Sequence, residues 1–189
     1  MSSFTVVFDA NVLYPAPLRD LLMRLATTGL FRARWTDRIH DEWIRNLLKN
    51  RPDIDPAKLK KTRQLMDNHC HDCLVTDYEG LIEHLQLPDP DDRHVLAAAI
   101  RCRADAIITC NLDDFPEVAL IKHGIQAIHP DDFVINNIDL NIAKVLEAVC
   151  KHRTSLKNPP VDVDTFLDTL LKQGLPQTVE VLRDYKLSF

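Results

Sequence analysis

Residues 89–115 place the strongest constraint on how this chain can fold. They begin with Asp89-Pro-Asp-Asp92, which is typical of a helix start because an Asp N-cap, a Pro and acidic residues complement the helix dipole. A small apolar helix follows over 95–100, and Ala106-Ile-Ile-Thr109 has the composition of a buried strand in a parallel sheet. Residues 111–114 then add carboxylates at the carboxyl end of that strand. Acidic side chains therefore gather at one edge of a single helix–strand unit.

Other short apolar runs alternate with helical patterns along the chain. The further predicted strands are 4–8, 31–35, 73–76 and 125–128. Helices are predicted from Leu18 to Leu25, after Thr36 or Asp37, and over 57–68, 79–85 and 117–122. This order predicts an α/β fold: a three-layer α/β/α domain over residues 1–136 with a mostly parallel five-stranded sheet.

Residues 137–189 have a different organisation and are predicted to form a helical C-terminal extension. A first helix ends near His152, Asn158-Pro-Pro160 forms a stiff link, and further helices lie around 166–171 and 178–185. Its apolar residues are expected to pack on the chain's own domain. They are Phe166, Leu167, Leu170, Val179 and Leu182.

Composition excludes several functional classes. The four glycines, at 29, 80, 124 and 174, are isolated, so neither a P-loop nor a dinucleotide-binding fingerprint is present. The net charge of −5 argues weakly against nucleic-acid binding. Four of the 28 acidic residues are candidates for one site, however, and without them 24 acids face 23 bases. Outside such a site the chain is nearly neutral.

The sequence also bears on location. The apolar run from Phe4 to Phe8 is too short for a signal peptide, and no segment is long and apolar enough to span a bilayer. The five cysteines show no framework spacing. We therefore expect a cytoplasmic protein with no membrane association.

Four carboxylates are predicted to meet at the carboxyl edge of the sheet, where open parallel sheets bind ligands. Asp9 follows the first strand, Glu42 borders the buried face of the helix after the second, Asp92 begins the helix before Ala106, and Asp114 follows that strand. Carboxylates about 5 Å apart repel by roughly 3 kcal/mol per pair at an effective dielectric of 20. Oxygen ligands with free positions suit Mg²⁺ or Mn²⁺, which lower the pKa of bound water and favour phosphodiester hydrolysis.

Each acid also has a simpler explanation. Asp89, Asp91 and Asp92 could only cap a helix, and Asp113 or Asp114 could only form a turn. Asp9 is harder to explain in this way, because a carboxylate directly after a buried strand is costly to desolvate without a partner. The convergence of all four acids favours a functional site.

The motifs together resemble a known family. They are Phe8-Asp9-Ala-Asn11-Val-Leu13, Asp41-Glu42-Trp43, Asp89-x-x-Asp92-x-x-Val-Leu-Ala-Ala-Ala99 and Thr109-x-Asn111-x-x-Asp114-Phe115. In this order they look like the four motifs of PIN-domain ribonucleases, in particular the VapC-type toxins of toxin–antitoxin pairs. The similarity covers residues 4 to 134.

The resemblance implies roles for individual residues. Asp9, Glu42, Asp92 and Asp114 would be the catalytic metal-site acids, with Asp113 a possible substitute for Asp114. Asn11, Thr109 and Asn111 would orient these acids or the water, and Asp89 would be an auxiliary acid. The resemblance also implies Mg²⁺- or Mn²⁺-dependent endonucleolytic cleavage of RNA, usually by a homodimer, and inhibition by an antitoxin protein.

Two other functions remain open. In a haloacid-dehalogenase-like phosphatase the nucleophilic aspartate also follows the first strand, but a second aspartate is expected where this chain has Asn11. A non-catalytic PIN-like module that binds a partner is the second alternative.

Three further features were considered. The segment His69-Cys-His-Asp-Cys73 contains zinc-type ligands without a second pair, so a helix end leading into a buried strand is the favoured interpretation. His94 could contact RNA or an acid, although a helix-surface histidine is the commoner outcome. A basic run from Arg45 to Arg63 could guide RNA toward the acids. The residues considered for RNA binding are Lys58, Lys60, Lys61 and Arg93, with Arg32, Arg34 and Arg38 as further candidates.

Overall fold

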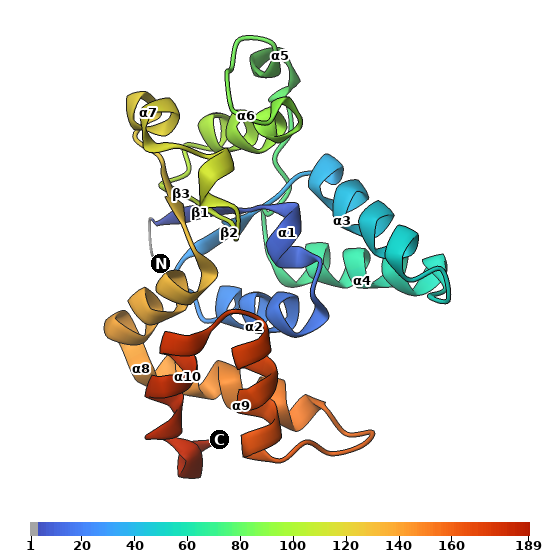
Figure 1. Ribbon diagram of the computed structural model, residues 1–189, viewed down its shortest axis with the longest axis vertical. Helices are drawn as coiled ribbons and strands as arrows, with labels where there is room; N and C mark the ends of the chain where they lie inside the picture. Colours follow the sequence, from blue (N-terminus) through green and yellow to red (C-terminus); the bar gives the residue numbers. More distant parts are fainter. Residues whose placement is uncertain (1–3) are drawn as a thin grey trace.

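A computed structural model describes residues 4–189 and contains one parallel sheet of four strands in the order β2-β1-β3-β4 (Figure 1). The strands are β1 (Thr5–Phe8), β2 (Arg32–Arg34), β3 (Ala106–Ile108) and β4 (Gln126–Ile128). In the central pair Val7 lies opposite Ile107. All carboxyl ends therefore point to one edge of the sheet, where the predicted acids lie.

Helices cover both faces of this sheet, which confirms the predicted three-layer α/β fold (Figure 1). The α-helices are α1 (Ala10–Leu13), α2 (Ala16–Ala26), α3 (Asp37–Asn50), α4 (Pro56–His69), α5 (Glu79–Ile82), α6 (Arg93–Arg101), α7 (Glu117–Leu120), α8 (Pro130–Ser155), α9 (Val163–Lys172) and α10 (Pro176–Arg183). The 3₁₀ turns are η1 (Pro90–Asp92), η2 (Leu112–Asp114), η3 (Ile121–His123) and η4 (Lys186–Ser188). Helix α6 contacts β1 and β3, and α2 and the start of α8 lie on the opposite face.

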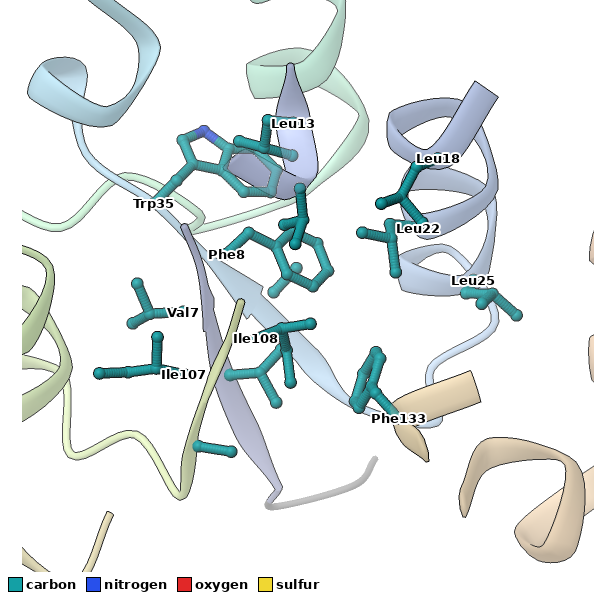
Figure 2. Close-up of a cluster of buried hydrophobic side chains, with 14 of the residues drawn as sticks. Val7, Phe8, Leu13, Leu18, Leu22, Leu25, Trp35, Ile107, Ile108 and Phe133 are labelled. Carbon is teal, nitrogen blue, oxygen red and sulfur yellow. The ribbon is translucent and has the colours of Figure 1, made fainter. Parts of the chain in front are cut away.

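The core follows from the two-residue repeat of the central strands, because successive side chains point to opposite faces. Phe8 and Ile108 point toward the leucines of α2 and toward Phe133 of α8, whereas Val7 and Ile107 point to the other face (Figure 2). All five of these side chains are at most 1% exposed. The apolar runs of β1 and β3 are thus central strands buried on both faces.

The predicted strand at 73–76 is reduced to a single bridge, so the five-stranded prediction was wrong in its strand count. Leu74 pairs with Trp35 beside the edge strand β2, and the Trp35 N–H donates to the Cys73 carbonyl at 2.9 Å. Asp72 and Asp77 have positive φ angles of 57° and 59°. These left-handed residues turn the chain on both sides of the bridge and prevent a longer strand.

Two helical segments begin at the N-cap residues that the sequence predicts. Thr36 caps α3 by accepting the Ile39 N–H, and Asp89 accepts the Asp91 N–H as predicted for an N-cap. The helix after Asp89 begins as the 3₁₀ turn η1 before it becomes α6. Gly124, with φ of 68°, ends η3 in the left-handed conformation that glycine adopts without strain.

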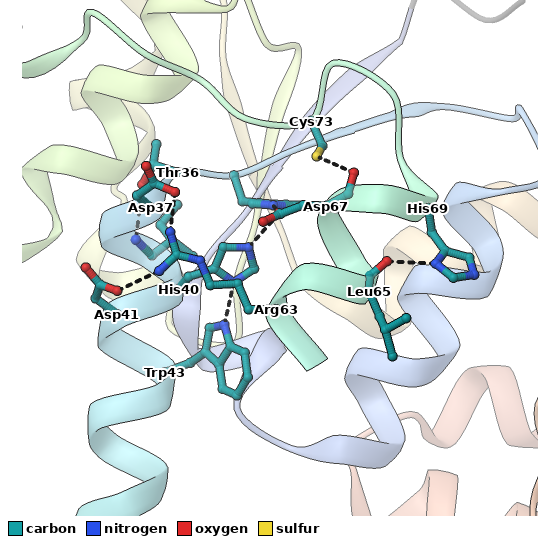
Figure 3. A network of polar contacts seen from close by, with 12 residues as sticks. Thr36, Asp37, His40, Asp41, Trp43, Arg63, Leu65, Asp67, His69 and Cys73 are labelled. Atoms are coloured by element: carbon teal, nitrogen blue, oxygen red, sulfur yellow. Dashed lines mark hydrogen bonds and ion pairs between the residues drawn. The ribbon is translucent and has the colours of Figure 1, made fainter. Parts of the chain in front are cut away.

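A buried polar contact holds α4 against α3 (Figure 3). Asp67 Oδ1 accepts hydrogen bonds from Trp35 Nε1 at 2.9 Å and from His40 Nε2 at 3.0 Å. The other ring nitrogen of His40 accepts the Trp43 Nε1–H at 3.0 Å. His40 and both tryptophans are fully buried. This contact fixes the direction of α3, the helix that carries Glu42.

The C-terminal extension packs on the chain's own domain, as expected. Helix α8 contacts α2 and α10, and α9 contacts α2 and α10 (Figure 1). Buried Asp131, at the start of α8, accepts the backbone N–H groups of Gln177 and Thr178 at 2.9 Å each. The five predicted apolar residues of the extension are each at most 1% exposed. The extension therefore shares a core with the first 136 residues.

The proposed boundary at 136/137 falls inside α8, the longest helix. Asn141 interrupts this helix with φ of −163° and ψ of 89°. The division into two domains stays a prediction. Within residues 4–189, none of the helices has both the length and the apolar character needed to cross a membrane.

Candidate active site

Asp9 lies at the carboxyl end of β1 and is 3% exposed. Its Oδ1 accepts the Ala10 N–H at 2.6 Å, so Asp9 is the N-cap of α1. Its Oδ2 accepts hydrogen bonds from the Asn11 amide at 2.6 Å and the Thr109 hydroxyl at 2.8 Å. Burial raises the pKa of Asp9 to about 6, although the bond from Thr109 opposes the rise. The fold thus holds a carboxyl group whose charged form is costly.

Asn11 and Thr109 join the ends of β1 and β3. The Asn11 amide also donates to Thr109 Oγ1 at 2.8 Å, and its oxygen accepts the Cys110 N–H at 3.0 Å. The backbone N–H of Asn111 donates to Thr109 Oγ1 at 3.0 Å. The side chains of Asn11 and Thr109 therefore fix the Asp9 carboxylate. Asn111 contributes its backbone N–H, which donates to Thr109.

Asp92 faces the other acids from the end of η1 and is half-buried. Its pKa is raised to about 7, first by burial and then by the negative charges of Asp9, Asp89, Asp114 and Glu42. Three of these acids, Asp9, Glu42 and Asp114, come from segments other than the one that carries Asp92. Negative charges so close together disfavour the charged form of Asp92, and the role of these acids in a metal site stays a prediction.

Asp113 and Asp114, the acidic pair that follows β3, lie in different environments. Asp114 is half-buried at the end of η2 and raises the pKa of Asp92. Asp113 is exposed and is not among the causes of that shift. The geometry favours Asp114 as the site residue, and its role stays a prediction.

Glu42 contacts His94, a partner that the sequence analysis did not specify. Glu42 Oε2 lies 3.1 Å from His94 Nε2. His94 is 1% exposed, so the expectation of a helix-surface histidine was wrong. The reason is that residues 94–99 are all buried, since α6 packs on the central strands. Of the two contacts considered for His94, the one with an acid is present.

The carboxylates are close enough to influence one another but are not gathered into a compact ligand set. Among residues 4–189, no group of three or more His, Cys, Asp or Glu side chains has a geometry suited to holding a metal. The donor set is nevertheless all oxygen and mutually repulsive, which suits a hard divalent cation. Binding of such an ion would require the side chains to move toward one another.

The basic residues proposed for RNA binding differ in exposure, and Arg34 and Arg93 are only partly exposed. Lys58, Lys60 and Lys61 are exposed on α4. Arg93 follows Asp92 directly, and its Nε donates to the Pro90 carbonyl at 2.9 Å. Contact of these residues with RNA stays a prediction.

The His69–Cys73 segment is a helix end that leads into a stretch in which buried and exposed residues alternate. His69 ends α4, and its Nδ1 lies 2.7 Å from the Leu65 carbonyl. Cys70 and Cys73 are buried, and burial raises their pKa values to about 11 and about 12. These two thiols are therefore neutral and pack as small apolar side chains in the core.

These features are those of a PIN domain, and comparison with known proteins agrees. The family model of the PIN domain matches residues 5–113, more than half of the chain. The chain belongs to the PIN-domain family. A second family model, the VapC50 C-terminal domain, matches residues 130–184.

One relative shares substantial identity with the chain. A protein of Mycobacterium tuberculosis named "Putative ribonuclease VapC50" is 42% identical over 86 residues, which are 46% of this chain and 50% of the relative. The match thus spans about half the length of that protein. No solved structure matches the chain.

Proposed function

We propose that this protein is an endoribonuclease that hydrolyses RNA phosphodiester bonds with a divalent cation, Mg²⁺ or Mn²⁺. The observation that carries the proposal is the position of Asp9, a buried carboxylate that Asn11 and Thr109 hold at the carboxyl end of β1. The charges of Glu42, Asp92 and Asp114 lie near enough to act on one another there. Membership of the PIN-domain family and the relative named as a ribonuclease support it.

In this proposal Asp9, Glu42, Asp92 and Asp114 hold the cation. A bound cation would activate water and stabilise negative charge on the phosphate. The chain's own contribution is to position these acids. Asn11 and Thr109 fix Asp9, the η1 turn directs Asp92, and η2 directs Asp114. Exposed lysines 58, 60 and 61 would attract the RNA backbone.

We further propose that the protein acts in the cytoplasm as the toxin of a toxin–antitoxin pair and as a homodimer. The resemblance to VapC-type proteins and the second family model support this role. A small protein encoded in the neighbouring reading frame would favour the toxin role. Its absence would favour a solitary housekeeping nuclease.

The two alternative functions are less well supported. A dehalogenase-like phosphatase needs a general acid two residues after the nucleophile, and Asn11 is there an amide bonded to Asp9 and Thr109. A non-catalytic binding module would have no need of a buried carboxylate such as Asp9, which costs free energy to keep charged.

The test of the proposed function is RNA cleavage by the purified protein. We expect cleavage with Mg²⁺ or Mn²⁺, none with EDTA, and a loss of about 1000-fold in Asp9→Asn, because that change removes a charge from the site. Gel analysis of a defined RNA measures the rate. Cleavage that persists in EDTA, or full activity of the variant, would contradict the mechanism.

A stability measurement tests the cation site without any RNA. The folded-state pKa values of about 6 for Asp9 and about 7 for Asp92 lie above the ordinary value of 3.8. These two groups therefore favour the fold below pH 4, and that contribution is lost as the pH rises through 6 to 7. A cation that binds the charged carboxylates restores the stability that is lost when they ionise. We expect Mn²⁺ to raise the melting temperature at pH 7.5 and to have little effect at pH 5.

The expected rise is about 5–10 °C at a Mn²⁺ concentration near 100 times Kd. His40 and His152 have lowered pKa values because they are buried, so they shift stability with pH in the opposite direction. Their contribution is the same with and without Mn²⁺ and cancels in the comparison. An equal rise at both pH values, or none at pH 7.5, would contradict carboxylate binding.

A further inference from the structure

His94 is a buried histidine that faces the acidic edge from α6. Its ring is 1% exposed, and Nε2 lies 3.1 Å from Glu42 Oε2 on α3. The two residues are 52 positions apart in the sequence. In the part of the chain that the structure describes, this contact is the one hydrogen bond or ion pair that involves the Glu42 side chain. Helices α3 and α6 are thus linked at the site.

The surroundings of His94 indicate which nitrogen carries the hydrogen. Nδ1 is buried and has no hydrogen-bond partner among the described residues. A hydrogen on Nδ1 would be a buried donor without an acceptor, which costs more than an unused lone pair. A hydrogen on Nε2 instead points at a carboxylate oxygen. The favoured tautomer therefore donates from Nε2 to Glu42.

Glu42 needs such a partner, because its neighbours repel it. The charge of Glu42 acts on both Asp9 and Asp92, so these acids in turn push the Glu42 carboxylate away from the edge. We infer that His94 is a positioning residue, whose Nε2–H holds the Glu42 carboxylate in the acidic site for RNA cleavage. This inference rests on the proposed function, in which Glu42 is one of the site acids.

A second histidine shows what a merely structural role looks like. His152 is also 1% exposed, and its Nδ1 also lacks a partner among the described residues. Its ring packs against Phe166 at 5.0 Å between centroids, within the C-terminal extension. No carboxylate is bonded to it in the described part of the chain. His152 is therefore a matched control for His94 in burial and chemistry.

The experiment compares cleavage of one RNA by five variants under saturating Mn²⁺. The variants are His94→Leu, His94→Gln, His152→Leu, Glu42→Gln and the double variant His94→Leu/Glu42→Gln. Leu removes the donor, whereas the Gln amide can place an N–H near the position of Nε2. We expect His94→Leu to lower kcat about 10- to 100-fold with KM within about threefold, because misplacement of a reacting group mainly slows chemistry.

The other variants separate positioning from folding. His94→Gln is expected to recover most of the lost kcat, and His152→Leu to keep the wild-type kcat at a temperature where it is folded. The double variant is expected to be no slower than Glu42→Gln alone, because His94 acts through Glu42. Nitrogen NMR of the His94 ring provides a readout that does not depend on cleavage. It is expected to show the Nε2–H tautomer and a changed Nε2 shift in Glu42→Gln.

The outcomes distinguish the two proposals. Wild-type kcat in His94→Leu, equal loss in the Leu and Gln variants, or losses that multiply in the double variant would overturn the role of His94 alone. A ring with its hydrogen on Nδ1 would also overturn it. If the wild-type protein cleaves no RNA with either Mg²⁺ or Mn²⁺, the proposed function fails and the inference fails with it.

Discussion

Asp92→Asn is expected to lower the rate of RNA cleavage about 1000-fold and, without divalent cations, to make the protein more stable. Both effects arise because the substitution removes the negative charge of Asp92. Asp92 is half-buried among four other acids, and its pKa of about 7 means that its charge opposes folding at pH 8. Because Asp92 is also partly solvated, the gain is roughly 1 kcal/mol, or about 2–4 °C. Cleavage assays and thermal unfolding at pH 8 in EDTA measure the two effects.

Asp113→Asn is the matched control for this prediction. Asp113 is one residue from Asp114, is exposed, and does not contribute to the shift at Asp92. The same chemical change there is expected to alter the cleavage rate by less than about threefold and the melting temperature by about 1 °C or less. Loss of stability in Asp92→Asn would show that the acids do not repel one another. A larger loss of activity in Asp113→Asn than in Asp114→Asn would reverse the choice between the two.

Leu170→Ala is expected to destabilise the whole protein by about 2–5 kcal/mol, although residue 170 lies far from the acids in the sequence. Leu170 is fully buried on α9, which packs against α2 and α10. Removing its side chain leaves a cavity between the extension and α2, one of the helices that cover the sheet. Urea unfolding followed by circular dichroism measures the free energy of unfolding.

Leu171→Ala provides the control, because Leu171 is the next residue and is 43% exposed. It is expected to cost less than about 1 kcal/mol. Both variants should unfold in a single transition if the extension and the sheet form one cooperative unit. A separate early transition in Leu170→Ala, with the rest of the protein unaffected, would show that the extension folds independently.

Local rules predicted most of the fold. The central strands β1 and β3 are continuous apolar runs, and the helix starts carry caps whose chemistry is local, as at Thr36 and Asp89. The parallel order of the strands follows from helices between them, because parallel strands require a crossover. The strand at 73–76 failed because its composition is strand-like while the flanking aspartates turn left-handed. Local composition does not reveal that turn.

The candidate site was predicted in part. Asp9, Asp92 and Asp114 could be proposed because each stands at an end of an element near one sheet edge. Glu42 could be proposed because it borders the buried face of α3. His94 could not be assigned correctly from the sequence, since its burial depends on which face of α6 meets the sheet. Its partner Glu42 lies on another helix.

The order of the elements and the caps of the helices could be predicted from the amino-acid sequence, because they depend on short-range periodicity and on the alternation of strands and helices. Only the tertiary structure decided which groups touch. It decided the bond of His94 to Glu42 and the bonds that Asp131 accepts from the start of α10. Such contacts join residues far apart in the chain, and their geometry is set by how whole elements pack together.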